Sequence, residues 1–422
     1  MIQPIVPQRP KDRFEVYRFF NGLSAEGQEG QDRGRNRIPL AKTFLLEHVS
    51  CRTGRTPKSP QVIFENLGTT VSPIDDTFLE IRDRVKGVAG APEQVEVTGY
   101  IEQYDERFFA YYTSEKSQEA RGRVRRWITR CSDLDATWFS GRLLQILWDR
   151  DVSNRGDDRF GKLIFKHESI YDLPEDAARQ SGEDEEEESG EEEERPERES
   201  RKARFEMGDR IGRIKASLGK LQSDYNPLNA LFALRFPSRL GHGSHDLYQF
   251  GQVTNRTDSF EDHRNLVRYL YRRYKMLLDL TEERAWHTME AVSAAPSMHL
   301  GVKGVPLTIR FEEPLPPAVF NRWVALAFQK RNQFRLWGEP IRLGPTKIHV
   351  YGADRHLWQP INIEITPERL VAILPQGTCG NTFHRLVTNV QRYVCPKIEA
   401  WIGEKPFNAL VDESQVKPEG DE

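Results

Sequence analysis

Three histidines in one short stretch have the spacing and the chemistry of metal ligands. His242 and His245 are separated by two residues in a Gly-rich segment, and His263 follows further along the chain. Neutral imidazole is an ordinary ligand for zinc or iron. The pattern predicts a divalent metal site, and the alternative is a polar surface loop whose histidines only form hydrogen bonds. No other cofactor is expected.

One cysteine is a candidate nucleophile. Cys379 lies in the Gly-rich segment QGTCGNTFH, just before a predicted helix, and His384 follows five residues later. Amides at a helix N-terminus stabilise a thiolate, and a nucleophile needs a base within reach. The pair is therefore a candidate for a cysteine-dependent hydrolase. The alternatives are a plain helix-capping turn and an anion pocket that includes Arg385.

Arginines and aromatic residues are interleaved in several other parts of the chain. Arginine pairs with phosphate and aromatic rings stack on bases, so this composition is typical of surfaces that contact nucleic acid. On a solvated helix the same arginines form salt bridges instead. The candidate binding residues are Arg121, Arg125, Arg126, Trp127, Arg268, Arg272, Arg335, Trp337 and Arg385.

The sequence motifs of several large enzyme classes are absent. There is no Walker A loop, no dinucleotide-binding glycine motif after a strand, no GxSxG elbow and no kinase motif set. An enzyme assembled from dispersed residues is still compatible with the sequence. The main interpretation is nevertheless a protein without catalytic activity.

A run of acidic residues interrupts the chain between positions 183 and 199. It contains no apolar side chain whose burial would offset the entropy cost of ordering it. From 183 to 204 the formal charge is −7, so the rest of the chain carries +4 within a total of −3. The run predicts a disordered linker between separately folded parts, which modulates access to basic surfaces.

The elements around this run predict a multi-domain α+β protein. Within the first part, the segment 13–20 alternates like a strand; beyond the linker, 237–257 is polar and reads as an irregular loop. The predicted division is an N-terminal α+β domain at 12–172, the acidic linker at 173–204, a mainly helical module at 205–295 with a long helix at 259–292, a C-terminal α+β domain at 300–407, and a flexible tail at 408–422.

The C-terminal segment has the clearest pattern. Its apolar periodicity predicts the order β-α-β-β-β-β-α, and the helix near 316–330 begins at a pair of prolines. An antiparallel sheet with both helices on one face is the simplest arrangement of these elements.

Composition limits the compartment and the class of protein. Four scattered cysteines without CxxC spacing argue against a disulfide scaffold or a zinc ribbon and fit a reducing interior. No signal peptide and no apolar stretch of 18 residues are apparent, so no membrane contact is expected. The sequence predicts a cytoplasmic binding or adaptor protein with a macromolecular partner, either nucleic acid or protein. The alternatives are a metal- or cysteine-dependent hydrolase and a structural subunit of a larger complex.

Overall fold

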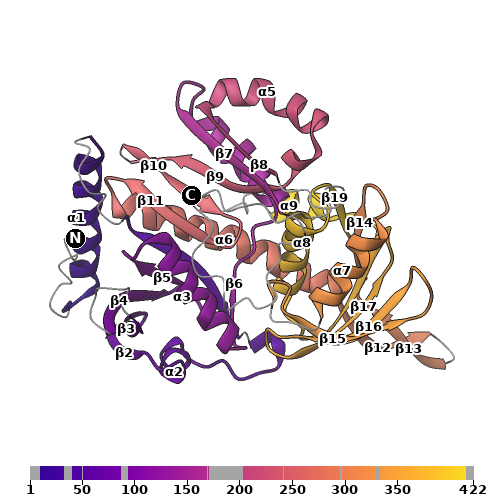
Figure 1. Cartoon of the computed structure of the whole chain (residues 1–422). Coiled ribbons are helices and arrows are strands. Elements are labelled where there is room, and N and C mark those ends of the chain that lie inside the picture. The colour runs from indigo at the N-terminus through magenta and orange to yellow at the C-terminus, as the bar shows by residue number, and fades with distance from the viewer. Residues whose placement is uncertain are drawn as a thin grey trace.

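The protein combines helices with two antiparallel sheets of 11 and nine strands (Figure 1). This computed structural model describes residues 10–32, 40–49, 51–86, 94–168, 170, 203–240, 242–294, 297–328 and 332–414. The α+β class is therefore confirmed. No helix within these ranges is both long and apolar enough to span a membrane.

The larger sheet has the strand order β2-β3-β4-β5-β1-β11-β10-β9-β7-β8, and β6 pairs with β1 outside this path. Strand β1 is central because β5, β6 and β11 all pair with it. The strands are β1 Lys42–His48, β2 Thr70–Asp75, β3 Phe78–Lys86, β4 Gln94–Gln103, β5 Phe108–Thr113, β6 Leu134–Ala136, β7 Phe160–His167, β8 Ala203–Arg210, β9 Leu231–Pro237, β10 Gly243–Tyr248 and β11 Gln252–Thr257.

The acidic run does not divide the chain between two sheets. Strands β7 and β8 lie on either side of it in the sequence, and they pair antiparallel from Phe160↔Arg210 to His167↔Ala203. Both strands belong to the larger sheet, which contains strands from both sides of the run. Residues 171–202 themselves lie outside the described residues. The run thus connects the two strands of a hairpin, a topology that composition alone cannot reveal.

The helical module predicted at 205–295 is not present as a separate unit. Its first half supplies β8 to β11 of the larger sheet. The polar stretch 237–257, predicted as a loop, contains the antiparallel hairpin of β10 and β11. The long helix is α6, Phe260–Ala285, whose N-terminus is capped by Ser259, and it ends earlier than predicted because β12 begins at Trp286. The other helices of this half are α1 Arg13–Asp32, α2 Pro60–Asn66, α3 Ser117–Arg130, α4 Gly141–Leu147 and α5 Ile211–Asp224.

The second sheet has the order β15-β16-β17-β18-β14-β19-β20, and a projecting hairpin of β12 and β13 joins it through β18. From β14 to α8 the element order is the predicted one, but β19 then returns to pair with β14, and part of the predicted tail forms α9. The elements are β12 Trp286–Ala294, β13 Ser297–Lys303, β14 Leu307–Phe311, α7 Pro317–Ala327, β15 Leu336–Arg342, β16 Ile348–Asp354, β17 Gln359–Ile365, β18 Arg369–Pro375, α8 Asn381–Tyr393, β19 Ile398–Ile402, β20 Lys405–Pro406 and α9 Phe407–Ser414.

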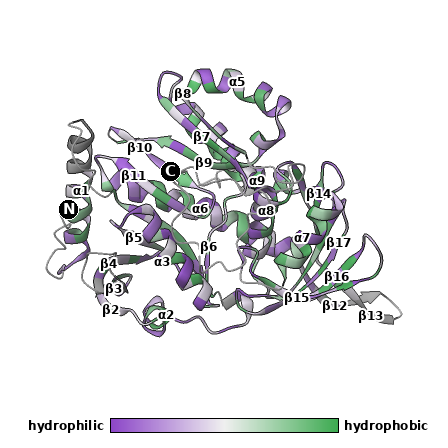
Figure 2. Ribbon diagram, in the orientation of Figure 1, coloured by the Kyte–Doolittle hydropathy of each residue, from purple (hydrophilic) through white to green (hydrophobic). Residues whose placement is uncertain are grey.

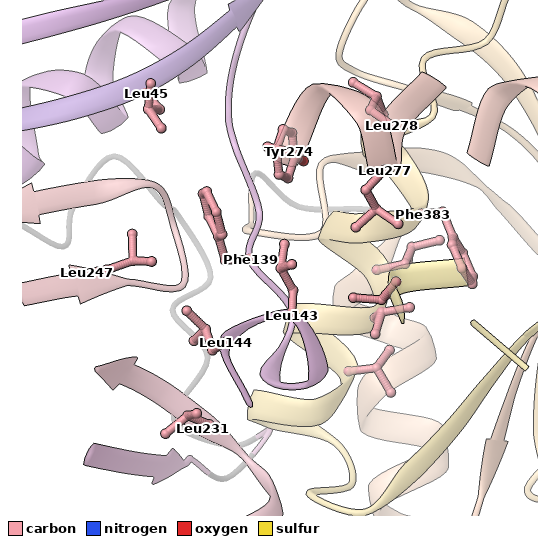
Figure 3. Packing of buried hydrophobic residues seen from close by; sticks show 14 of the residues in the cluster. Leu45, Phe139, Leu143, Leu144, Leu231, Leu247, Tyr274, Leu277, Leu278 and Phe383 are labelled. Carbon is pink, nitrogen blue, oxygen red and sulfur yellow. The ribbon is translucent and has the colours of Figure 1, made fainter. Parts of the chain in front are cut away.

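A single apolar core connects the two sheets. One cluster of buried side chains includes Leu45 of the larger sheet and Val350 of the second sheet. Figure 3 shows three further members of this cluster, Leu143 of α4, Leu277 of α6 and Phe383 of α8. In Figure 2 hydrophobic residues recur along β16 and β17, in keeping with strands that bury only one of their faces.

We expect cleavage within the acidic run to leave both parts of the chain associated, because the β7–β8 pairing and the shared core do not depend on the covalent link. Limited digestion with a glutamate-specific protease, followed by size-exclusion chromatography, measures this. The nicked protein should elute as one species in native buffer and as two fragments in urea. Fragments that separate without denaturant would contradict the shared sheet.

Candidate functional site

The second sheet leaves one face open to solvent, and that face carries large aromatic side chains. Along β15, Leu336 is buried whereas Trp337 is 52% exposed. Along β16, Val350 is buried whereas Tyr351 is 67% exposed. Helices α7 and α8 lie on the opposite, buried side of the strands (Figure 1). Exposed rings of this size are informative because a fold has no need to display them.

Two of these rings lie close together, and a third is on a neighbouring strand. The ring of Trp358, which is 53% exposed, is 6.5 Å from the ring of Trp337. Trp337 pairs with Ala353, so Tyr351 is at the diagonal position on the same face, where the Cα atoms of an antiparallel sheet are about 7–8 Å apart. We call Trp337, Tyr351 and Trp358 the aromatic face.

Trp358 is held on this face by an unusual backbone turn. Leu357 and Trp358 both have positive φ, at 68° and 51°, which costs non-glycine residues on the order of 1–3 kcal/mol each. Leu357 is buried, and its backbone N–H donates to the Ser132 carbonyl at 2.9 Å. The turn is thus anchored to the loop before β6, and this anchoring leaves the indole of Trp358 in solvent.

Charged side chains of both signs lie on the same side of the sheet as the aromatic face. On the same side of the sheet, the carboxylate of Glu364 lies 2.8 Å from Lys347 and 2.9 Å from His349. Hydrogen bonds from Lys347 and then His349 lower the pKa of Glu364. Arg310 lies over the ring of Trp401, with 5.0 Å between the guanidinium carbon and the ring centre. This mixture of aromatic rings, cations and carboxylates favours stacking over long-range attraction of phosphate.

Two arginines predicted to bind a partner are buried instead. Arg385 of α8 forms ion pairs with Asp135 of β6 and Asp354 of β16, and Arg335 lies 3.1 Å from Asp135. Burial alone would raise the pKa of Asp135, but the charges of Arg385 and Arg335 outweigh it and lower the pKa to about 2. These arginines therefore connect the two sheets and are not available to a partner.

Of the two candidate binding arginines on α6, one forms an internal ion pair and the other is exposed. Arg268 donates to Glu102 of β4 at 2.6 Å, whereas Arg272 is exposed. The pKa of Glu102 would be raised by burial, but hydrogen bonding from Arg264 and the nearby arginine charges lower it. Arg268 is thus partly committed to an internal ion pair.

The predicted binding residues on α3, namely Arg121, Arg125, Arg126 and Trp127, belong to a second basic and aromatic area, separate from the aromatic face. Arg121 stacks on the ring of Tyr248 at 4.6 Å and donates to Gln252 at 2.6 Å. Trp127 is 4% exposed, and Arg125 and Arg126 are half-buried. Among the predicted binding residues, Trp337 and Arg272 are exposed, and the side chain of Arg268 is 41% exposed despite its ion pair.

Cys379 is buried in an ion-pair cluster rather than exposed as a nucleophile. Its thiol donates to Glu47 of β1 at 3.1 Å, and Arg107 lies 3.4 Å from the sulfur. Burial, and then the charge of Glu47, raise the pKa of Cys379 well above its usual value. This is the opposite of the shift that activates a thiolate. The hydrogen bond recorded for His384 is with Thr281, so the structure gives the predicted pair no direct contact within the described residues.

The three predicted metal ligands do not converge. His242 is exposed, whereas the rings of His245 and His263 are buried and stacked at 5.4 Å. His263 shares a hydrogen bond with Thr43 of β1 at 2.6 Å, and burial lowers the pKa of His245 to about 4. Within the described ranges, these histidines do not form a group of ligand atoms that lie within 4.8 Å of one another.

The sequence interpretation missed two of the three aromatic-face residues. Tyr351 follows from the alternation of β16, which would have placed it opposite the buried valines and isoleucines. Trp358 has no such signal, because its exposure depends on the turn conformation.

The described fold and face define an α+β protein with two packed antiparallel sheets and an exposed aromatic surface. A family model described as MJECL33-like protein matches residues 24–408, and the chain belongs to this family. It is 25% identical over 147 residues to the Uncharacterized protein MJECL33 of Methanocaldococcus jannaschii; this covers 35% of the chain and about a third, 34%, of that relative. No solved structure matches.

We expect Asp135→Asn to destabilise the protein by about 3–5 kcal/mol at pH 7, because it leaves buried guanidinium groups short of a counter-charge. The folded-state pKa of Asp135 is about 2, below its ordinary value of 3.8. The contribution of the Asp135 carboxylate to the free energy of unfolding is therefore present above about pH 4 and is lost as the pH falls toward 2. Urea unfolding of both proteins at pH 7 and pH 3 measures this.

The matched control is Asp158→Asn, since the side chain of Asp158 is 95% exposed in its pair with Arg210. It should change the free energy of unfolding by no more than about 0.5 kcal/mol. An equal effect of the two substitutions at pH 7 would show that the buried network contributes no special stability.

Proposed function

We propose that this protein is a non-catalytic, cytoplasmic adaptor that binds single-stranded nucleic acid on the aromatic face of its second sheet. The observation that carries the proposal is the exposure of Trp337, Tyr351 and Trp358, each more than half, on one open sheet face. An open antiparallel sheet with helices behind it and aromatic rings in front suits the stacking of unpaired bases.

The energetics of the face favour this ligand. The rings are rigid and already in place, so stacking a base on them requires little ordering of the protein. Trp358 is held in place by a backbone turn with two positive φ values, and strain of this kind is concentrated at functional positions. Arg310, beside Trp401 on β14, is a cation at the far side of the same sheet that suits contact with the backbone of a strand bound across it.

A hydrolase function receives less support. Burial raises the pKa of the Cys379 thiol, and His242 is exposed whereas His245 and His263 are buried and stacked on each other. A protein partner is the second interpretation of the aromatic face, since Ile341 and Ile373 are also exposed on it. The experiments below therefore include self-association as an outcome.

We expect Trp337→Ala, Tyr351→Ala and Trp358→Ala each to weaken binding of fluorescent dT15 or rU15, by about 1–3 kcal/mol for every base that loses its stacking partner. Fluorescence anisotropy measures the affinity. Because stacking dominates over ion pairing, the affinity should fall only shallowly with salt.

The matched control is Phe160→Ala, because Phe160 is also 53% exposed but lies on β7 of the larger sheet. It should leave the affinity unchanged. The proposal fails if wild type binds neither oligonucleotide, or if the control weakens binding as much as the three variants. It also fails if the substitutions instead abolish a concentration-dependent dimer seen by analytical ultracentrifugation, since that assigns the face to a second copy.

The acidic run has a proposed regulatory role that rests on its charge and its attachment. The chain leaves the larger sheet after His167 of β7 and returns to it at Ala203 of β8, and near this end of the pair Lys166 and Arg392 both contact Glu168. The formal charge of −7 carried by residues 183–204, tethered there, repels a polyanion and lowers its local concentration near the protein.

We expect deletion of residues 183–199 to strengthen oligonucleotide binding at about 0.1 M salt and to have little effect at about 1 M, where the Debye length falls from about 10 Å to about 3 Å. A variant that replaces the same residues with uncharged Gly and Ser separates charge from length. Equal affinities of wild type and both variants at the lower salt concentration would reject a regulatory role for the charge.

A further inference from the structure

Three side chains from distant parts of the chain meet inside the protein at the junction of the two sheets. They are Glu47 at the end of β1, His356 in the turn between β16 and β17, and Cys379 in the turn before α8. One ligand atom from each lies within 4.8 Å of the other two. All three residues are at most 1% exposed.

The imidazole of His356 is oriented as in a metal ligand. Its Nδ1 lies 3.0 Å from the backbone carbonyl oxygen of Ser132. A carbonyl oxygen only accepts, so Nδ1 carries the proton and Nε2 has a free lone pair. Within the described residues, this buried Nε2 has no hydrogen-bond partner. A histidine that donates one ring N–H to a carbonyl and presents the other nitrogen is the usual arrangement around a metal ion.

Glu47 also has an unused acceptor at the same place. Its Oε1 accepts from Arg107 at 2.6 Å and from the Cys379 thiol at 3.1 Å. Its Oε2 is buried and has no partner in the described parts of the chain. Two unpartnered polar atoms next to a thiol are costly unless a third group satisfies them together.

We infer that Glu47, His356 and Cys379 bind one divalent transition-metal ion, and that zinc is the metal their chemistry selects. Thiolate sulfur, imidazole nitrogen and carboxylate oxygen are the three ligand types of protein zinc sites. Magnesium and calcium prefer oxygen ligands alone, so the sulfur and nitrogen ligands disfavour them. Three protein ligands are the number found in zinc sites that keep one coordination position open.

The charge of the cluster is suited to a cation. Glu47 and Glu282 are balanced by Arg107, which donates to both carboxylates at 2.6 Å, and this leaves one negative charge. Arg52, which reaches Glu282 at 3.3 Å, is itself balanced by Asp279 at 2.8 Å. On binding, the metal replaces the thiol proton: a metal–sulfur bond forms, the proton leaves to solvent, and the cluster becomes neutral.

The ion would join the two sheets directly. Glu47 belongs to the central strand of the larger sheet, whereas His356 and Cys379 belong to turns of the second sheet's part of the chain. This site is distinct from the stacked pair of His245 and His263, because that pair contacts β1 at Thr43, four residues before Glu47. The inference does not rest on the proposed function, although His356 lies in the same turn as Trp358 of the aromatic face and shares with Leu357 the carbonyl of Ser132.

The test is the metal content of the full chain, purified after expression with zinc and without chelators. Mass spectrometry of the metal should find about one zinc per chain, and Cys379→Ser, His356→Gln and the near-isosteric Glu47→Gln should each lower it about tenfold or more. Cobalt bound in place of zinc should give a near-ultraviolet sulfur-to-cobalt absorption band in wild type that Cys379→Ser lacks.

Two matched controls are Cys395→Ser, which removes a partly buried thiol elsewhere, and His245→Gln, which removes a buried imidazole outside the cluster. Both should retain the zinc. If Cys379→Ser does not fold, the zinc content of Glu47→Gln and the cobalt spectrum of the wild type still test the proposed site. A wild type with less than about 0.1 zinc per chain, a cobalt spectrum without the sulfur band, or zinc retained by all three ligand variants overturns the site.

Discussion

The guanidinium of Arg385 remains charged inside the protein, and the arrangement of the two sheets satisfies that charge. Its two carboxylate partners come from different sheets, Asp135 from β6 and Asp354 from the end of β16. Arg335 also contacts Asp135, so the network holds two guanidinium groups and two carboxylates, and loss of either carboxylate would leave one buried positive charge uncompensated, which is far more costly than an ion pair is stabilising. The ion pairs therefore form only when α8 lies between the sheets, and they select one docking geometry from the many that apolar contacts alone would allow.

That docking determines which surface of the second sheet remains available. Helix α8 buries nearly every side chain, including polar ones such as Asn381 and Asn389, because both sheets contact it. The covered face of β15 to β18 is consequently apolar, and the opposite face is left to solvent. The aromatic face is thus on the side of the sheet away from the ionic network. Because its side chains are exposed, we expect substitutions on it to change binding more than stability.

The part of the fold that the sequence predicted well is the part with regular alternation. From β14 to α8 the apolar residues repeat with a period of two and then near 3.6, and the predicted order is observed. Residues 13–20 were predicted as a strand but begin α1, because eight residues with scattered aromatics fit both periods. The hairpin of β10 and β11 resembled a loop because its inward side chains are polar: Asp246, for example, is buried between Arg235 and Arg256. The periodicity of apolar residues along the sequence does not reveal buried ion pairs of this kind.

The candidate sites could likewise be predicted only where the signal lies in neighbouring residues of the sequence. Trp337 was predicted from its basic and aromatic neighbours, whereas Arg335 and Arg385 fitted the same pattern but are buried, since their carboxylate partners lie far away in the sequence. Glu47 and His356 belong to no motif, and their proximity to Cys379 depends on the packing of the two sheets.

The pairing of β7 with β8 constrains neither the length nor the composition of the segment that connects them. These strands are paired up to His167 and Ala203, so register, twist and core contacts are determined before the chain leaves the sheet. The entropic cost of closing such a loop grows only with the logarithm of its length, by about 0.6 kcal/mol for each doubling. Among relatives of this protein, the segment is therefore free to lengthen, shorten or change composition at little cost to folding. The same property makes it a natural position for inserting an affinity tag or a fluorescent reporter domain.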